Sequence, residues 1–214
     1  MSVICPTVTA YNQEEYKQQI ERLRPFARRI HLDLMDGEFT SKTSVPLNEM
    51  WWPRKIKADI HMMCKRPFDY IDRIHHLEPG LVITHAEADG NFIEWADRLR
   101  HYSEIKIGVS LLQDTDPELI KPALARIDHV LVFSGNLGRF GGKAELKYLD
   151  KVKRLKQWKP ELEIGWDGGI NEWNTTLLID GGVDVLNVGG FIQKAEDPKA
   201  AYDTLVALAE NRDE

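Results

Sequence analysis

Short runs of β-forming residues recur along this chain, and an amphipathic helical pattern follows nearly every one. A parallel strand needs a crossover of a dozen or more residues, usually a helix, before its neighbour. The alternation therefore predicts an α/β protein with a parallel sheet. The expected strands cover residues 3–5, 29–34, 57–62, 81–85, 106–111, 130–133, 162–167 and 183–188. The helical patterns cover residues 14–28, 91–102, 144–158, 171–180 and 198–211, and two more begin at 67 and 116.

Eight such units favour a closed (β/α)8 TIM barrel. The length of 214 residues lies near the lower end of the range for this fold. A doubly wound open sheet is the alternative. No linker, low-complexity segment or shift in composition divides the chain, so we expect a single domain over residues 1–214.

Charge and composition exclude several kinds of partner. The chain has 28 basic and 34 acidic residues, a net charge of −6, which argues against a nucleic-acid surface. No apolar run approaches the roughly 20 residues of a membrane span. The only cysteines are Cys5 and Cys64, and no basic region precedes an apolar segment at the N-terminus. We therefore expect reduced thiols and a cytoplasmic location, with no membrane or nucleic-acid partner. A small-molecule substrate and a homo-oligomer are further expectations that composition does not test.

Polar residues stand at the carboxyl ends of the expected strands. His31 and Asp33 are two residues apart, so their side chains share one face of the second strand. His61 lies near the end of the third strand and Asp167 ends the seventh. In a barrel all these ends meet at the face where active sites are built. His85, Ser110 and Ser134 end, or directly follow, the fourth, fifth and sixth strands.

Four of these side chains are typical metal ligands. His31, Asp33, His61 and Asp167 make a mixed nitrogen and oxygen set, which favours zinc, iron, cobalt or manganese over magnesium or calcium. The pattern does not choose among the four metals. The alternative interpretation is that each residue is a hydrogen-bonded polar group at a strand end.

The two aspartates also suggest a reaction. Asp33 ends the second strand and Asp167 the seventh, on opposite sides of an eight-stranded ring, so a substrate carbon can fit between them. One carboxylate can remove a proton and the other can return one to the opposite face, which inverts the stereocentre. A metal ion stabilises the enediolate oxygen that forms between the two steps. Hydrolysis by metal-activated water is the competing chemistry for the same ligands.

Glycine pairs follow the last three expected strands. Bare backbone N–H groups beside helix N-termini are where barrels often hold a phosphate group, and Arg139 or Lys143 can add a cation. Ordinary turns are the alternative explanation. The pairs are Gly141 and Gly142, Gly168 and Gly169, and Gly189 and Gly190.

Five ordered motifs resemble the signatures of the ribulose-phosphate 3-epimerase family. They are His31-Leu-Asp-Leu-Met-Asp-Gly, Asp59-Ile-His-Met-Met, Thr84-His-Ala-Glu-Ala, the loop at 136–142, and Asp167-Gly-Gly-Ile-Asn. The similarity extends from Pro6 to about Pro198. Five motifs in order are far more specific than any one of them.

The resemblance implies a (β/α)8 barrel that interconverts ribulose 5-phosphate and xylulose 5-phosphate with a divalent metal. It implies Asp33 and Asp167 as acid/base residues, and His31, Asp33, His61 and Asp167 as metal ligands. Substrate contacts are then expected from Thr9, His61, Gly141, Gly142, Gly168, Gly169, Gly189 and Gly190.

The chain departs from the family pattern around the substrate. Thr9 stands where the family has a serine, Leu137 replaces a proline, Arg139 is an extra residue, and Gly190 replaces a serine. These changes leave two alternatives to a pentulose phosphate epimerase. One is an epimerase of a hexulose 6-phosphate such as allulose 6-phosphate, and the other is a non-catalytic sugar-phosphate-binding barrel.

Overall fold

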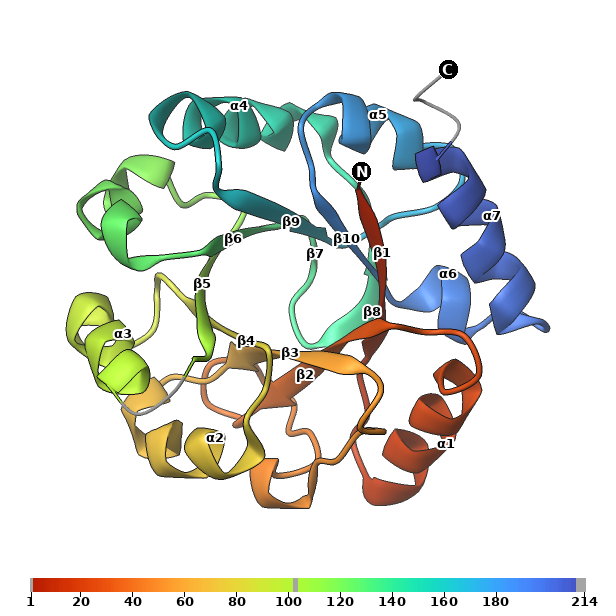
Figure 1. Cartoon of the computed structure of the whole chain (residues 1–214), viewed down its shortest axis with the longest axis horizontal. Helices are drawn as coiled ribbons and strands as arrows, with labels where there is room; N and C mark the ends of the chain where they lie inside the picture. The colour runs from red at the N-terminus through yellow and green to blue at the C-terminus, as the bar shows by residue number, and fades with distance from the viewer. Residues whose placement is uncertain (1, 102–103, 211–214) are drawn as a thin grey trace.

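The computed structural model describes residues 2–101 and 104–210, and its centre is a closed barrel of parallel strands (Figure 1). The order around the barrel is β1, β10, β9, β6, β5, β4, β3 and β2. Pairing of Val3 with Val185 joins the first and last strands and closes the ring. This confirms the TIM barrel and excludes the open sheet. The strands are β1 (Val3–Val8), β2 (Arg29–Met35), β3 (Lys57–Met63), β4 (Leu81–His85), β5 (Lys106–Leu111), β6 (His129–Phe133), β9 (Glu163–Asp167) and β10 (Val185–Val188).

Helices surround the barrel and cover the outer faces of its strands (Figure 1). In α1, Tyr16, Ile20 and Leu23 recur at helical spacing and are buried, and the Asn12 side chain caps the first turn by accepting the Glu15 N–H at 3.0 Å. None of the described helices is long and apolar enough to cross a membrane. The α-helices are α1 (Gln13–Leu23), α2 (Ile71–Leu77), α3 (Phe92–His101), α4 (Leu149–Trp158), α5 (Thr175–Asp180), α6 (Gly190–Gln193) and α7 (Pro198–Glu210).

Several connections are 3₁₀ rather than α-helical. The helix expected from residue 116 is η3 (Pro117–Arg126), a 3₁₀ segment that contains Pro122. Proline lacks the N–H that an α-helix interior needs and its ring clashes with the preceding turn, so the α-helical expectation is wrong here. The shorter 3₁₀ segments are η1 (Leu47–Glu49), η2 (Pro67–Tyr70) and η4 (Leu146–Tyr148).

One feature differs from the expected order of elements. The glycine-rich loop after β6 forms an antiparallel hairpin, β7 (Gly135–Asn136) with β8 (Arg139–Gly142), which lies within the outline of the barrel in Figure 1. The helices expected to end at residues 102 and 211 have those last residues outside the described part of the chain.

An ionic network fills the amino-terminal end of the barrel. Nε of Arg29 on β2 donates to Asp59 on β3 at 2.6 Å, and its two terminal nitrogens donate to the Glu163 carboxylate on β9 at 3.1 and 2.9 Å. His129 on β6 places Nδ1 2.8 Å from Glu163 Oε1. Bidentate pairs of this kind are strong because each hydrogen bond carries charge. The barrel end opposite the polar strand ends thus holds its carboxylates around a permanent cation.

The neighbouring strand leaves space for the histidine of this network. A Cβ atom at Gly165 would lie 2.5 Å from Nε2 of His129, closer than real atoms approach. Glycine at this position therefore allows the His129 imidazole to turn inward toward Glu163.

We predict that Glu163→Gln lowers the free energy of unfolding at pH 7 by about 2 kcal/mol, because it removes the charge that Arg29 and His129 face. Burial alone would raise the pKa of Glu163, but hydrogen bonds from His129 and Arg29 hold it well below its usual range. The folded pKa thus lies below the unfolded one of about 4.3, so the stabilisation is complete above that pH and declines as the pH falls toward the folded pKa.

Urea unfolding of both proteins between pH 3 and 8 measures this difference. The gap between the wild type and Glu163→Gln should be constant near neutrality and should shrink below about pH 4. The control is Glu161→Gln, an exposed carboxylate two residues away. A gap that does not change with pH would contradict the ionic assignment.

Candidate active site

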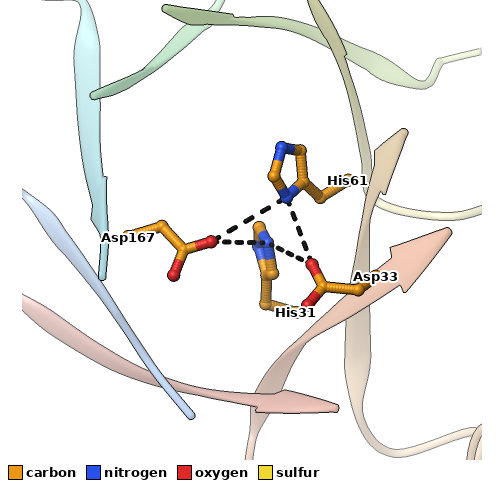
Figure 2. Close-up of side chains that lie close together, drawn as sticks. All are labelled: His31, Asp33, His61 and Asp167. Atoms are coloured by element: carbon orange, nitrogen blue, oxygen red, sulfur yellow. Dashed lines mark hydrogen bonds and ion pairs between the residues drawn. The ribbon is translucent and has the colours of Figure 1, made fainter. Parts of the chain in front are cut away.

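Four titratable side chains meet at the carboxyl end of the barrel (Figure 2). His31 and Asp33 project from the same face of β2, His61 lies beside Asp33 in the register of β3, and Asp167 ends β9. One nitrogen or oxygen atom from each residue lies within 4.8 Å of the others. The structure therefore brings together the four residues that the sequence analysis expected to converge.

The contacts within this cluster are short but are not all hydrogen bonds. Nδ1 of His61 lies 3.2 Å from Asp33 Oδ1 and 3.8 Å from Asp167 Oδ2. Nε2 of His31 lies 3.5 and 3.7 Å from the same two oxygens. Within the described residues, neither ring nitrogen of His31 makes a hydrogen bond, although the ring is fully buried.

This arrangement fits a divalent cation. Buried polar atoms are normally hydrogen-bonded, so an imidazole without a partner beside two carboxylates indicates a missing ligand. Two nitrogen and two oxygen donors match zinc, iron, cobalt or manganese. The cluster can thus hold a metal ion, and the identity of the metal remains a prediction.

The same crowding perturbs the protonation of the cluster. Burial lowers the pKa of His31 to about 4. Burial alone would raise the pKa of Asp33, but the two imidazoles hold it well below its usual range. Burial and repulsion by Asp33 raise the pKa of Asp167 well above its usual range. Without a cation, two carboxylates this close do not ionise together easily.

Thr9 orients one of the two carboxylates. The hydroxyl of Thr9, directly after β1, donates to Asp33 Oδ2 at 2.5 Å. Asp33 Oδ1 is left to face the histidines and Asp167. Thr9, a predicted substrate contact, therefore lies both against Asp33 and in the wall of the adjoining cavity.

A cavity of about 330 Å³ opens beside the cluster. Asp33 and Asp167 line it, whereas His61 is not among its described lining residues and contacts Asp33 at 3.2 Å. All six glycines expected to contact the substrate are in its wall: Gly141, Gly142, Gly168, Gly169, Gly189 and Gly190.

Two basic residues reach this cavity. Arg139 on β8 lines it, as does Lys194 directly after α6, which the sequence analysis did not single out. Lys143 is 82% exposed, pairs with Glu145, and is not among the described lining residues. The position of Lys194, one helical turn after Gly190, is the sequence signal that could have found it.

Comparison with known proteins identifies relatives over most of the chain. The family model described as the ribulose-phosphate 3 epimerase family matches residues 3–192. The ribulose-phosphate 3-epimerase of Helicobacter pylori is 30% identical over 187 residues, which cover 82% of this chain and 84% of that protein. The ribulose-phosphate 3-epimerase of Aquifex aeolicus is 27% identical over 216 residues, covering 97% of each chain.

Solved structures resemble this one in fold. KGPDC from Streptococcus mutans superposes with a TM-score of 0.78 at 14% identity, covering 99% of this chain and 98% of that one. A 3-hexulose-6-phosphate synthase superposes with a TM-score of 0.75 at 14% identity, covering 96% and 99%. At these identities the likeness concerns the barrel alone.

We predict that the protein, purified without chelator or affinity tag, carries about one divalent transition-metal ion per chain. His31→Leu and Asp167→Asn should each weaken zinc binding by more than about 100-fold, because losing a ligand costs more than losing an outer partner of a ligand. Elemental analysis and competition with a chromophoric chelator measure both quantities.

The control for this experiment is His76→Asn, which changes an exposed histidine on α2. Its zinc affinity should equal that of the wild type. Equal zinc affinity in His31→Leu, Asp167→Asn and the wild type would contradict the proposed site.

Proposed function

The chain belongs to the ribulose-phosphate 3-epimerase family, and from that premise we propose that it inverts C3 of a ketose phosphate, interconverting ribulose 5-phosphate and xylulose 5-phosphate. The observation that carries the proposal is the placement of Asp33 and Asp167. They approach one site from two sides, as Figure 2 shows, and both line the same cavity.

In the proposed reaction one proton is removed from C3 of the sugar and another proton is added to the opposite face of the same carbon. The C3 hydrogen of the sugar is acidic because C3 adjoins the C2 carbonyl. One carboxylate removes this proton, which leaves a planar enediolate, and the carboxyl group on the opposite face then delivers a proton to C3. Thr9 holds Asp33 in position for its part through the hydrogen bond to Oδ2.

His31, Asp33, His61 and Asp167 would hold a divalent ion in this enzyme. When bound, the ion supplies positive charge where negative charge develops on the sugar oxygens. The burial of both histidines excludes water from that side of the site, which strengthens every charge interaction within it.

The glycine-rich wall suits the phosphate group. Backbone N–H groups can approach an anion closely only where no side chain intervenes. At Gly141 the position of a Cβ atom is open space, so the backbone there is accessible from the cavity. Arg139 and Lys194 add positive charge to the wall of the same cavity. We assign the phosphate to this region and the reacting carbon to the space between the two aspartates.

The substrate and the function each have an alternative. A hexulose 6-phosphate such as allulose 6-phosphate is the alternative substrate, and a non-catalytic sugar-phosphate-binding barrel is the alternative function. The cytoplasmic location and the homo-oligomeric state also stay predictions.

We predict that the wild type places solvent deuterium at C3 of ribulose 5-phosphate in D₂O, because the removed proton and the returned proton come from different carboxyl groups. Asp33→Asn should lower the rate of epimerisation at least about 100-fold, since an amide cannot accept the proton. Nuclear magnetic resonance of the sugar follows both events, with allulose 6-phosphate assayed in parallel.

The matched control is Asp150→Asn, an exposed position on α4 that should keep full activity. Bound metal is measured in each variant, so that loss of the ion is distinguished from loss of the base. Undiminished turnover in Asp33→Asn would contradict the two-base assignment, and binding of both sugars without any exchange would favour the non-catalytic alternative.

We also predict that Arg139→Gln and Lys194→Gln each raise KM for the sugar phosphate by about three- to tenfold with little change in kcat, because they remove charge from the phosphate end only. Steady-state kinetics measure both constants. The control is Lys143→Gln, whose side chain points to solvent and should leave KM unchanged. An unchanged KM in either test variant would remove that residue from the phosphate site.

A further inference from the structure

A third buried imidazole lies behind His61. His85 ends β4, its side chain is fully buried, and its Nε2 lies 2.9 Å from Nε2 of His61. His85 is not one of the four clustered metal-ligand candidates. In Figure 2 one ring nitrogen of His61 faces the two carboxylates, and the other points away from them.

The contact between the two rings restricts where their protons lie. A neutral imidazole has one N–H donor and one acceptor nitrogen, so a hydrogen bond between two Nε2 atoms needs one donor and one acceptor. His61 can offer a cation the lone pair of Nδ1 only if its proton is on Nε2. In that state Nε2 of His85 must accept, and the proton of His85 is on its Nδ1.

The carboxylate of Glu87 lies beside Nδ1 of His85 and favours a proton on that nitrogen. Its Oε2 lies 3.4 Å from Nδ1 of His85, within ion-pair distance, and neither atom makes a hydrogen bond among the described residues. Its Oε1 accepts the backbone N–H of Leu112 at 3.0 Å and the hydroxyl of Thr115. Burial alone would raise the pKa of Glu87, but His85 and these donors hold it below its usual range. An ionised carboxylate only accepts, so it favours a proton on Nδ1 of His85.

Asp33 also affects the tautomer of His61, because it contacts the Nδ1 atom of that ring directly. Its Oδ1 lies 3.2 Å from Nδ1 of His61 and favours a proton there, which would occupy the nitrogen that a cation needs. The two carboxylates therefore compete for the tautomer of His61, one directly and one through His85.

We propose that Glu87 and His85 are positioning residues that hold His61 as the Nε2–H tautomer, so that Nδ1 is available to a divalent cation before the cation arrives. This inference deepens the proposed function and rests on its metal site. Outer partners of metal-bound histidines act in this way in general, and their loss typically weakens metal binding about 10- to 100-fold.

Because Oε1 of Glu87 is held by two donors, the effect of Glu87→Gln on the tautomer of His61 can be predicted. In Glu87→Gln the amide oxygen stays on the fixed backbone N–H of Leu112, so the amide NH₂ faces His85 and donates to its Nδ1. His85 must then carry its proton on Nε2, and His61 is driven to the Nδ1–H tautomer. We expect side-chain ¹⁵N resonances of the metal-free protein to show this reversal at His61, and zinc affinity to fall about 10- to 100-fold.

A double-mutant comparison tests whether Glu87 acts through His85. In His85→Leu the link is absent, so adding Glu87→Gln should change zinc affinity by less than twofold. His85→Gln keeps an acceptor for the His61 N–H and should recover part of the affinity that His85→Leu loses. The matched control is Glu94→Gln, an exposed carboxylate on α3 that pairs with Arg98. Thermal unfolding identifies any variant that has lost its fold.

The outcomes separate this inference from the proposed function. A wild type that binds no zinc would overturn both. Normal zinc binding by the wild type, with an unchanged His61 tautomer and unchanged affinity in Glu87→Gln, would overturn this inference alone. An equal effect of Glu87→Gln with and without His85 would also overturn it, because Glu87 would then act by another path.

Discussion

The concentration of like charge at one end of the barrel is the constraint on which the rest of the site depends. Asp33 is buried and Asp167 is partly buried beside His31 and His61, and no permanently charged side chain balances them among the described cluster residues. Carboxylates buried without a cation are costly, and their protonation becomes unequal. A divalent ion would resolve this conflict, and the proposed sugar chemistry would use the same charge. The site therefore keeps an electrostatic imbalance that a core built only for stability would not contain.

The carboxylates at the two ends of the barrel are balanced by positive charge in different ways. At the amino-terminal end, Arg29 binds Asp59 and Glu163 directly, so the buried carboxylates have a permanent counter-charge within the chain. At the carboxyl end the counter-charge has to come from outside. This division follows a general property of such barrels, in which one end contributes stability and the other carries function. It also explains how the chain tolerates an unbalanced site, because the ionic network at the opposite end ties β2, β3, β6 and β9 together.

The period-two pattern of strands made much of this structure predictable. It placed His31 and Asp33 on one face, and apolar runs located β4 and β5 at their observed bounds. The link from His61 to His85 was not predictable, because it depends on the tilt and register between neighbouring strands, and His61 pairs in register with Ile83 rather than His85. The hairpin of β7 and β8 was missed because glycine-rich segments carry no hydrophobic periodicity. Pro122 overrode an apparent helical pattern through its missing N–H.

The hairpin that departs from the family pattern lines the cavity beside the two aspartates, so its position bears on the length of the substrate. The hydroxyl of Tyr11 donates to the carbonyl of Gly138 at 3.0 Å, which ties the hairpin tip to the chain after β1. This bond links the hairpin tip to the strand end that carries Thr9, the residue bonded to Asp33. With the phosphate at the glycines and C3 between the aspartates, a pentulose 5-phosphate has two carbons between its reacting carbon and its phosphate ester oxygen. A hexulose 6-phosphate has three, so binding its phosphate at the same place would bring C4 between the aspartates unless its chain folds. With the phosphate at the proposed place, this spacing would favour the shorter sugar through geometry rather than through contacts with its hydroxyl groups.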